Sequence, residues 1–363
     1  NGRFHSDWLS MMYSRLKLAR NLLSENGVIF ISINDVEHAN LKKICDEVFG
    51  TINFIESYVW ESTFRPDNSS PINRKNAESI LCYSKNKITI KKLNGHLKGS
   101  DGLPSLTKNS MNEVILKFKA GSVDFLIADG RYSSGLMDSG YELLNDVIIE
   151  DSLNINDFSL KGRMTWGQAN LEAEMNNGTR IVIKTLGFVP YVKKAEINNM
   201  SPNTIIPKEI VGDVLEGRAT LSALFDKPVF SYPKPVSLIE YLTCYFEEKE
   251  FIVMDFFSGS ASTAQAIMNL NAKDGGKRQF ILVQIPEILD ASVAKSARAK
   301  VTIESAIELC HDKKIAPTVA EISKERIRRA GKKIVTDNAD KEGIENLDIG
   351  FRVLKIDSTN MKD

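Results

Sequence analysis

The segment that most constrains the fold is an apolar run that leads into a turn of small residues and then into a helical pattern. It covers residues 251–264 and reads Phe-Ile-Val-Met-Asp-Phe-Phe-Ser-Gly-Ser-Ala-Ser-Thr-Ala. The first four residues are typical of a buried strand, and a helix is predicted from about 262 to 270. Small residues let a ligand approach the backbone, and the helix N-terminus offers free N–H groups with partial positive charge. Because ligands of open α/β sheets bind at the carboxyl ends of strands, this turn is the first candidate site.

The glycine content of this turn narrows the class of ligand. A dinucleotide fingerprint needs G-x-G-x-x-G, but only Gly259 is present, and Ala261 and Ala264 stand where further glycines would be expected. That disfavours NAD and suits a ligand without a pyrophosphate, such as S-adenosylmethionine. Taken alone the turn is a weak signal, because an ordinary tight strand–helix turn would have the same sequence character.

Helix-like and strand-like segments alternate on both sides of the chain's middle. Apolar residues at helical spacing predict a helix over 7–24 that Gly27 ends, and the β-branched run 28–33 suits a buried parallel strand. Asp35 is expected to cap the next helix, 36–48. This alternation predicts a mainly parallel α/β sheet. Further strands are expected at 53–60, 79–84, 280–284 and 350–356, further helices at 237–246, 292–310 and 318–330, and a polar loop at 61–77.

The character of the chain changes between residues 93 and 225. Segments there are short and rich in Gly, Asn and Ser, with weak β patterning at 113–118 and 180–185. We interpret this stretch as an inserted α+β module. The expected organisation is therefore a first half at 1–92, the insert at 93–225, a second half at 226–335, and the start of a C-terminal region at 336–363.

Composition excludes several classes of protein. The 363 residues have a formal net charge of +0. The 4 cysteines form no C-x-x-C pair, so we expect neither a zinc site nor a disulfide framework. We expect a cytoplasmic location for the same reason. The sequence has neither an apolar run long enough to span a membrane nor an apolar signal core in its first residues. Basic residues gather at 294–333, which is equally compatible with a nucleic-acid surface and with two solvated helix faces.

A few polar and aromatic residues lie where they could contact a ligand. Gln284 or Glu287, after a predicted strand, could bind ribose hydroxyls, although either could equally be an ordinary surface residue. Lys234 precedes Pro235, a typical first-turn proline, and could meet a carboxylate. Trp60 ends a strand and could stack on an extruded base, although core packing is the more common fate of a tryptophan.

Taken in order, six segments resemble the modification subunits of type III restriction–modification systems. The segments that resemble the catalytic side precede the insert, and the cofactor loop follows it, which is the order of β-type amino-methyltransferases. The resemblance implies a Rossmann-like sheet of an S-adenosylmethionine-dependent methyltransferase, with an inserted target-recognition region. The segments are 1–23, 27–33, 78–86, 232–235, 255–263 and 347–355.

The same resemblance implies an activity, partners and site residues. The family transfers a methyl group from S-adenosylmethionine to the 6-amino group of adenine in duplex DNA, works as a homodimer, and joins a helicase–nuclease restriction subunit. The residues implied to bind the cofactor are Asp255, Phe257, Ser258, Gly259 and Ser260, with Gln284 or Glu287 on its ribose, Lys234 near its carboxylate, and Trp60 in the base pocket.

Three departures from the family qualify this expectation. No two prolines are adjacent, so the family's catalytic Asp-Pro-Pro-Tyr is missing and no catalytic residue is assigned here. In the family that motif lies upstream of the position matching Asn1, and the family continues past Asp363, so we expect a truncated chain that is inactive alone. Ala261 and Ser262 stand where the family usually carries Gly and Thr. The alternatives are a non-catalytic DNA-specificity protein, an RNA or protein methyltransferase, and an NAD-binding oxidoreductase.

Overall fold

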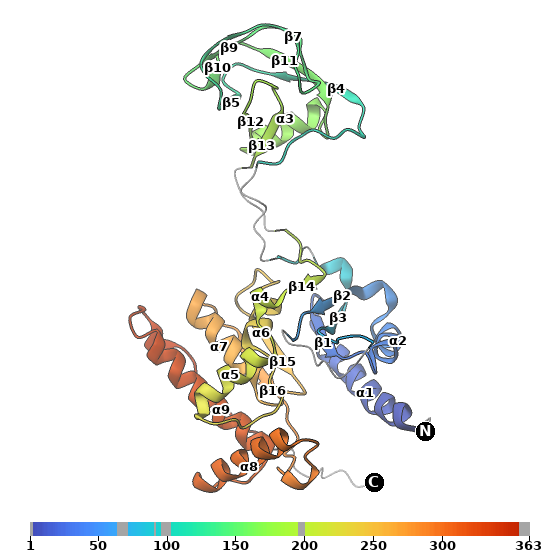
Figure 1. Ribbon diagram of the computed structural model, residues 1–363, viewed down its shortest axis with the longest axis vertical. Helices are drawn as coiled ribbons and strands as arrows, with labels where there is room; N and C mark the ends of the chain where they lie inside the picture. Colours follow the sequence, from blue (N-terminus) through green and yellow to red (C-terminus); the bar gives the residue numbers. More distant parts are fainter. Residues whose placement is uncertain (1–2, 64–71, 91, 96–102, 195–199, 356–363) are drawn as a thin grey trace. The chain divides into compact units, whose positions relative to one another are not determined.

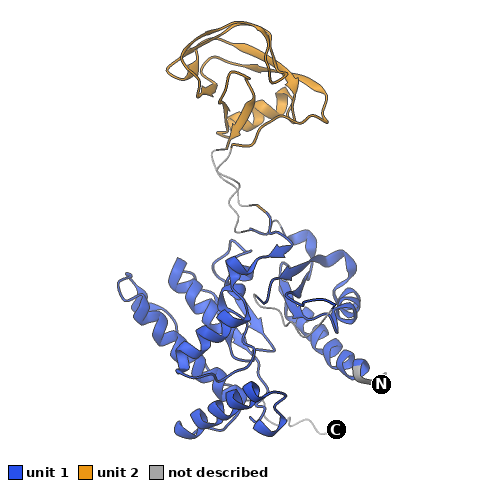
Figure 2. Cartoon of the chain, viewed as in Figure 1, with its two compact units in different colours: residues 1–96, 201–363 blue, residues 97–200 orange. Residues whose placement is uncertain are grey.

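The computed structural model describes residues 3–63, 72–90, 92–95, 103–194 and 200–355. The chain divides into two compact units (Figure 2), unit 1 formed by residues 1–96 with 201–363 and unit 2 formed by residues 97–200. The insert predicted at 93–225 is longer than unit 2, because the elements between residues 205 and 225 belong to unit 1. The described helices include none that is long and apolar enough to cross a bilayer.

Most elements of both units are labelled in Figure 1. Unit 1 contains α1 (Arg3–Leu22), β1 (Val28–Ile33), α2 (His38–Phe49), β2 (Phe54–Trp60), β3 (Glu78–Ser84), β14 (Ile205–Ile206), α4 (Lys208–Val211), α5 (Val214–Phe225), α6 (Val236–Thr243), β15 (Ile252–Asp255), α7 (Ser262–Asp274), β16 (Gln279–Leu282), α8 (Ala297–Asp312) and α9 (Val319–Asp337). Unit 2 contains β4 (Glu113–Phe118), β5 (Val123–Phe125), β6 (Gly130–Tyr132), β7 (Gly135–Leu136), β8 (Glu142–Leu143), β9 (Val147–Glu150), β10 (Leu153–Asn154), β11 (Phe158–Arg163), α3 (Gln168–Asn176), β12 (Arg180–Ile183) and β13 (Pro190–Lys193).

A four-stranded sheet of order β1-β3-β2-β14 carries the first half of unit 1. Alternate residues of β3 face opposite sides, as the pleat of a strand requires. Leu81 and Tyr83 pack into one core with α1 and α2, whereas Ile80 and Cys82 pack into a second core with α6. Both faces of this sheet are therefore covered by helices, which makes the structure α/β as expected.

The expected mainly parallel arrangement is wrong for this sheet. Strand β3 pairs antiparallel with both β1 and β2, and only β14 pairs parallel with β2. The described residues between β2 and β3 contain no crossover helix, and consecutive neighbouring strands joined without a crossover run in opposite directions. Within the expected connecting loop 61–77, residues 64–71 lie outside the described residues.

A second, two-stranded sheet carries the candidate turn. Strands β15 and β16 are parallel and are joined through α7, so the segment forms a βαβ unit. The strand at 251–254 is confirmed, but its expected burial is wrong, since Ile252 is 59% and Met254 39% exposed. One face of the sheet packs with α7 and α9, whereas no described element covers the other face.

Side chains cap some helices at the N-terminus, but not all of them. The side chains of Asp213, Ser296 and Thr318 cap α5, α8 and α9 by accepting N–H groups of the first turn. The cap expected from Asp35 is wrong, because Glu37 occupies the N-cap of α2 without a side-chain bond. The strand expected at 350–356 is also wrong over residues 350–355, where the chain is irregular, and Ile356 lies outside the described residues.

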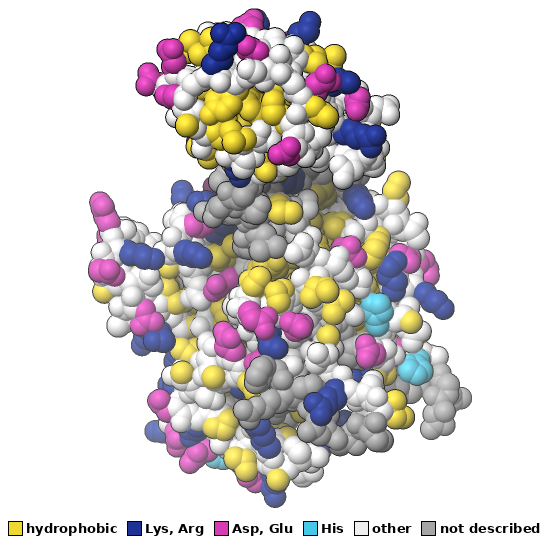
Figure 3. Space-filling model, turned by 45° about the horizontal axis from the view of Figure 1, so that its top comes forward, with side chains coloured by type: hydrophobic (Ala, Val, Ile, Leu, Met, Phe, Trp, Pro, Cys, Tyr) yellow, Lys and Arg dark blue, Asp and Glu magenta, His cyan; other side chains and the backbone are white. Residues whose placement is uncertain are grey.

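Unit 2 is built from two sheets around one apolar core. Its strand orders are β13-β12-β5-β10-β9-β6 and β4-β11-β8-β7. The strand expected at 113–118 matches β4, and the strand expected at 180–185 matches β12. The face shown in Figure 3 carries interspersed acidic and basic side chains on both units, in keeping with the formal net charge of +0.

Candidate functional site

The turn between β15 and α7 has a backbone conformation that few residues adopt easily. Gly259 has φ +51° and Ala261 has φ +61°, both in the left-handed region. Asp255 fixes the start of the turn, because its carboxylate accepts the Phe257 N–H at 3.1 Å and the Thr263 hydroxyl at 2.6 Å. The turn is therefore held by the acid that ends the strand, not by glycines alone.

Helix α9 holds the turn from its buried side. The Ser323 hydroxyl donates to the Gly259 carbonyl oxygen. Arg326 donates from Nη1 to the Ser260 carbonyl oxygen at 3.2 Å and to the hydroxyls of Ser260 and Ser262 at 2.8 and 2.7 Å. Its Nε and Nη2 donate to Oε1 of Gln265, at 3.1 and 3.0 Å. One guanidinium thus joins α9 to both the turn and the first part of α7.

Arg326 is an unusual charge for a protein interior. Its side chain is 0% exposed, and among the described residues no carboxylate pairs with it. Burial lowers the pKa of the guanidinium to about 9, so the group stays charged at neutral pH. An isolated buried charge is costly, and here neutral oxygens of the turn and of α7 compensate it. The turn therefore sits above a fixed positive charge.

One aromatic ring of the turn is exposed, and one hydroxyl of the turn is buried without a partner among the described residues. Phe257 is 53% exposed, and Ser258 is buried with a hydroxyl that has no hydrogen-bond partner among the described residues. Gln284 is committed, since its Oε1 accepts the Gly259 N–H at 2.8 Å and its Nε2 donates to the Ile285 carbonyl oxygen at 3.0 Å. Glu287 is exposed just beyond β16.

Lys234 connects this turn with the strand edge that carries Trp60. The Lys234 carbonyl oxygen accepts the Ser262 hydroxyl at 3.0 Å, its ammonium pairs with Glu78, and that ammonium lies 4.8 Å from the centroid of the Trp60 ring. The predicted cofactor turn and the predicted base-side strand end are therefore neighbours. The ammonium of Lys234, however, already has a carboxylate partner within the chain.

Trp60 does not have the exposure that a base-stacking residue needs. Its ring is 0% exposed, and its Nε1 donates to the Gly212 carbonyl oxygen at 3.1 Å. It belongs to the core between the four-stranded sheet and α6. In this packing the ring face is not available to an extruded adenine, so we do not retain Trp60 as a base contact.

The sequence-based reasoning missed Ser323 and Arg326. Arg326 was counted only as one member of the basic run 294–333, which contains buried and paired cations as well as solvated ones. A usable signal was present: Ile322, Arg326 and Ala330 recur at intervals of four and share one helix face. An arginine at an otherwise apolar, core-facing position indicates a buried polar partner.

Comparisons with known proteins indicate the family of the chain. A protein family described as DNA methylase matches residues 2–311. The chain is 31% identical to the Type III restriction-modification enzyme StyLTI Mod subunit of Salmonella typhimurium, over 96% of this chain and 48% of the relative. It is 31% identical to the EcoPI Mod subunit of Escherichia phage P1, over 96% and 53%. It is 27% identical to the Type II methyltransferase M.KpnI of Klebsiella pneumoniae, over 77% and 67%.

The matches cover almost the whole chain but only part of its relatives. The chain spans about half the length of the two Mod subunits. The family match includes both sheets of unit 1, with the β15–α7 turn and the strand edge beside it, and it ends before α9. The chain therefore belongs to the DNA methylase family.

Proposed function

We propose that the chain binds S-adenosylmethionine at the β15–α7 turn and is part of a site-specific DNA adenine methyltransferase of a restriction–modification system. The observation that carries the proposal is the turn itself, clamped from α9 and joined through Lys234 to the neighbouring sheet edge. Family membership supplies the reaction class. We infer further that β15, α7 and β16 form the cofactor half of a Rossmann-like sheet.

The free atoms of the turn decide which residues would contact the cofactor. Phe257, Ser258 and Gly259 would flank it, because the first is exposed and the hydroxyl of the second lacks a partner among the described residues. Glu287 suits the ribose hydroxyls better than Gln284, whose amide is already bonded on both sides. Lys234 would reach a cofactor carboxylate only by leaving Glu78.

Other predicted residues would act by shaping the turn. Asp255 and Ser260 use their polar atoms inside the protein, so they would position Phe257 and Gly259 rather than touch the cofactor. When bound, the cofactor supplies the methyl group. The protein's contribution is then alignment, since holding the acceptor amine in line with the reacting carbon removes much of the barrier.

The acceptor is proposed to be an adenine that has left the duplex. Its 6-amino group is conjugated with the ring and lies inside the helix, so the base has to be extruded at a cost of a few kcal/mol. Unit 2 is the candidate reader of base edges in the major groove. By analogy with the Mod subunits, we propose a homodimer, a restriction subunit as partner, and a cytoplasmic location for the whole enzyme.

A cofactor titration tests the proposal. The wild-type chain is titrated with S-adenosylmethionine by calorimetry, beside Glu287→Gln and Phe257→Ala. Loss of a hydrogen bond to a charged group should weaken binding by roughly tenfold in Glu287→Gln. Glu250→Gln is the matched control, because Glu250 is also exposed and lies just before the other strand, β15. Absence of binding by the wild-type chain would overturn the proposal.

Methyl transfer is a separate measurement. The 363-residue sequence contains no adjacent prolines and so no Asp-Pro-Pro-Tyr, which carries the base-side chemistry in the family it resembles. We expect the chain to bind the cofactor but to incorporate no tritiated methyl group into adenine-containing duplex DNA. Clear turnover by the pure chain would contradict the assignment of catalysis to that missing motif.

A further inference from the structure

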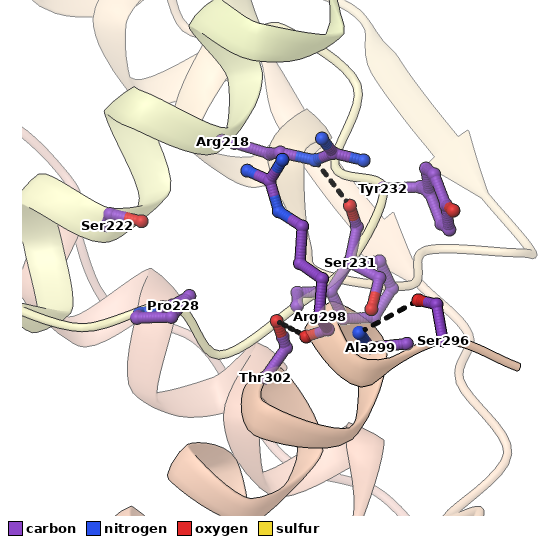
Figure 4. A pocket seen from close by; sticks show the side chains of 10 residues that line it. Arg218, Ser222, Pro228, Ser231, Tyr232, Ser296, Arg298, Ala299 and Thr302 are labelled. Atoms are coloured by element: carbon purple, nitrogen blue, oxygen red, sulfur yellow. Dashed lines mark hydrogen bonds between the residues drawn. The ribbon is translucent and has the colours of Figure 1, made fainter. Parts of the chain in front are cut away.

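A small pocket on unit 1 collects two arginines from different helices. It lies between α5, the segment that precedes α6, and the first turn of α8 (Figure 4). Arg218 of α5 and Arg298 of α8 line it together with Tyr232 and hydroxyl side chains, and no acidic residue is part of its wall. Its volume is about 70 Å³. The pocket is therefore cationic and just large enough for a single small group.

Among the described residues, neither arginine has a carboxylate to neutralise it. Arg218 donates from Nε to the Ser231 carbonyl oxygen at 2.7 Å, and its guanidinium lies 5.0 Å from the centroid of the Tyr232 ring. Arg298 is exposed, and the described residues supply no ion pair to either guanidinium. Figure 4 shows the Arg298 side chain extending from α8 toward the Arg218 side chain of α5, whose guanidinium is directed toward the Ser231 carbonyl oxygen and the Tyr232 ring. Two like charges that line one pocket without an acid repel each other, and an anion bound between them would remove that cost.

Several other cations of the basic segment 294–333 are paired with acids. Lys313 and Arg329 each contact Glu325 at 2.8 Å, and Lys324 pairs with Glu321. Those cations are therefore used inside the fold. At the start of α8, Lys300 pairs with Glu304 at 3.9 Å, whereas Arg298 forms no ion pair among the described residues. Arg298 is therefore one of the cations of this segment that the described carboxylates leave unneutralised, and it lines the pocket.

Size and chemistry indicate a phosphate group. A cavity of about 70 Å³ is well below the ~300–1,000 Å³ of pockets that enclose a drug-sized ligand, so it admits an oxyanion but not a whole cofactor. Guanidinium groups bind phosphate oxygens through two parallel hydrogen bonds, and the N-terminus of α8 adds partial positive charge. Tyr232, 71% exposed at the rim, offers a surface for a neighbouring sugar.

The pocket adjoins the cofactor turn without being part of it. Phe230 lines the pocket, and its ring also lies against Gly259, where an added Cβ would be 3.4 Å from Phe230 Cζ. We propose that Arg218 and Arg298 form a binding site for one phosphate group of the DNA backbone, in the pocket that shares Phe230 with the surroundings of the turn. The inference rests on the proposed function, because it assumes that the chain binds DNA.

Salt dependence of DNA binding tests this site. Binding of a fluorescently labelled duplex is measured by anisotropy over a series of salt concentrations, for wild type, Arg298→Ala and the double variant Arg218→Ala/Arg298→Ala. Each phosphate contact adds about 0.9 to the slope of log K against log salt. We expect the slope to fall by about 1 in Arg298→Ala, with affinity lower by roughly three- to tenfold on any duplex sequence.

Two further variants separate a site from a general effect of charge. Arg20→Ala removes the same charge from an exposed position at the end of α1, outside the pocket, and should leave the slope unchanged. Arg298→Lys keeps the charge but loses the two-pronged geometry, so it should bind with intermediate affinity. Equal losses in Arg20→Ala and Arg298→Ala would overturn the proposal.

A titration of the same variants with S-adenosylmethionine tests whether the pocket binds the cofactor carboxylate and not a DNA phosphate. S-adenosylmethionine carries a carboxylate, and its affinity should change by less than about twofold in Arg298→Ala if the pocket binds DNA. A loss of cofactor affinity with unchanged DNA binding would overturn the proposal and assign the pocket to that carboxylate. A wild-type chain that binds no DNA would defeat the DNA part of the proposed function, whereas variants that bind DNA like wild type would defeat this inference alone.

Discussion

The two sheets of unit 1 are stabilised in different ways. In the four-stranded sheet, β3 is buried on both faces, and its residues from Ile80 to Tyr83 are all 0% exposed. In the two-stranded sheet, one face packs with α7 and α9, whereas Ile252 and Ile281 on the other face are 59% and 47% exposed. The first sheet is fixed by apolar packing, and the turn at the end of the second is fixed by hydrogen bonds from Arg326 and Ser323.

This contrast bears on where the candidate site lies. A sheet that is packed on both sides tolerates little movement, because interiors are close-packed. The β15–β16 sheet is held on one side only, so the geometry of its turn depends on a few polar contacts. Function is therefore proposed beside a sheet with one exposed face, at a turn that depends on individual hydrogen bonds.

The largest expected effect separates the two sheets by their packing. Leu81→Ala in β3 removes a fully buried side chain and should lower the free energy of unfolding by about 3 kcal/mol. Ile281→Ala in β16 removes a side chain that is 47% exposed and should cost less than about 1 kcal/mol. Urea denaturation of both variants measures the difference. Similar losses would mean that the open face of β16 is covered in solution.

The clamp from α9 should matter for both stability and binding. Arg326→Ala leaves the oxygens of Ser260, Ser262 and Gln265 without their buried donor, at a cost of about 2 kcal/mol in the free energy of unfolding. Because the turn loses its support, the affinity for S-adenosylmethionine should fall by about tenfold as well.

A matched control and a conservative variant test the role of the Arg326 clamp. Arg328→Ala changes an arginine on the same helix that is half exposed and contacts Glu325 only at 3.7 Å, so it should alter neither quantity appreciably. Arg326→Lys keeps the charge and should restore part of the cofactor affinity. A variant of Arg326 that loses stability but binds the cofactor like wild type would contradict a positioning role.

Glu325, on the same helix, should make the stability of the protein depend on pH. Burial by itself would raise the pKa of this carboxyl, but hydrogen bonds from Arg329 and Lys313 outweigh it and lower the pKa below 4.5. The folded form therefore binds the proton less readily than the unfolded form. The resulting stability is present above pH 4.5 and is lost as the pH falls through the pKa of the folded state.

Replacing the carboxyl tests this linkage. Glu325→Gln should be less stable than wild type at neutral pH, and the difference should shrink as the pH is lowered below 4.5. Thermal unfolding at several pH values measures it. Glu345→Gln is a suitable control, because this exposed carboxyl shows no comparable ion pair among the described residues. A difference that stays constant with pH would show that Glu325 acts through packing alone.

How much the sequence could predict also differs between the two sheets. The strand–turn–helix at 251–264 was found from residue types alone, because strand period, small residues and helix period are local signals. The antiparallel insertion of β3 between β1 and β2 was not, because pairing partners are set by the connection over 61–77 and by long-range packing. The burial of Trp60 and the pairing of Lys234 with Glu78 likewise depend on contacts between distant segments.

The smallest expected effect concerns the one non-glycine residue that the turn holds in a left-handed conformation. Ala261 and Ala264 are both 0% exposed alanines at the start of α7, but only Ala261 has a positive φ, at +61°. Relief of a left-handed alanine is worth roughly 1–2 kcal/mol, which offsets the lost methyl group and the greater freedom of glycine in the unfolded chain. The free energy of unfolding of Ala261→Gly should therefore lie within about 1 kcal/mol of the wild-type value. Ala264→Gly relieves no strain, so its free energy of unfolding should be lower than that of wild type by about 1.5 kcal/mol. Equal losses in the two variants, measured by urea denaturation, would mean that the turn stores no backbone strain and that its shape depends on the α9 clamp alone.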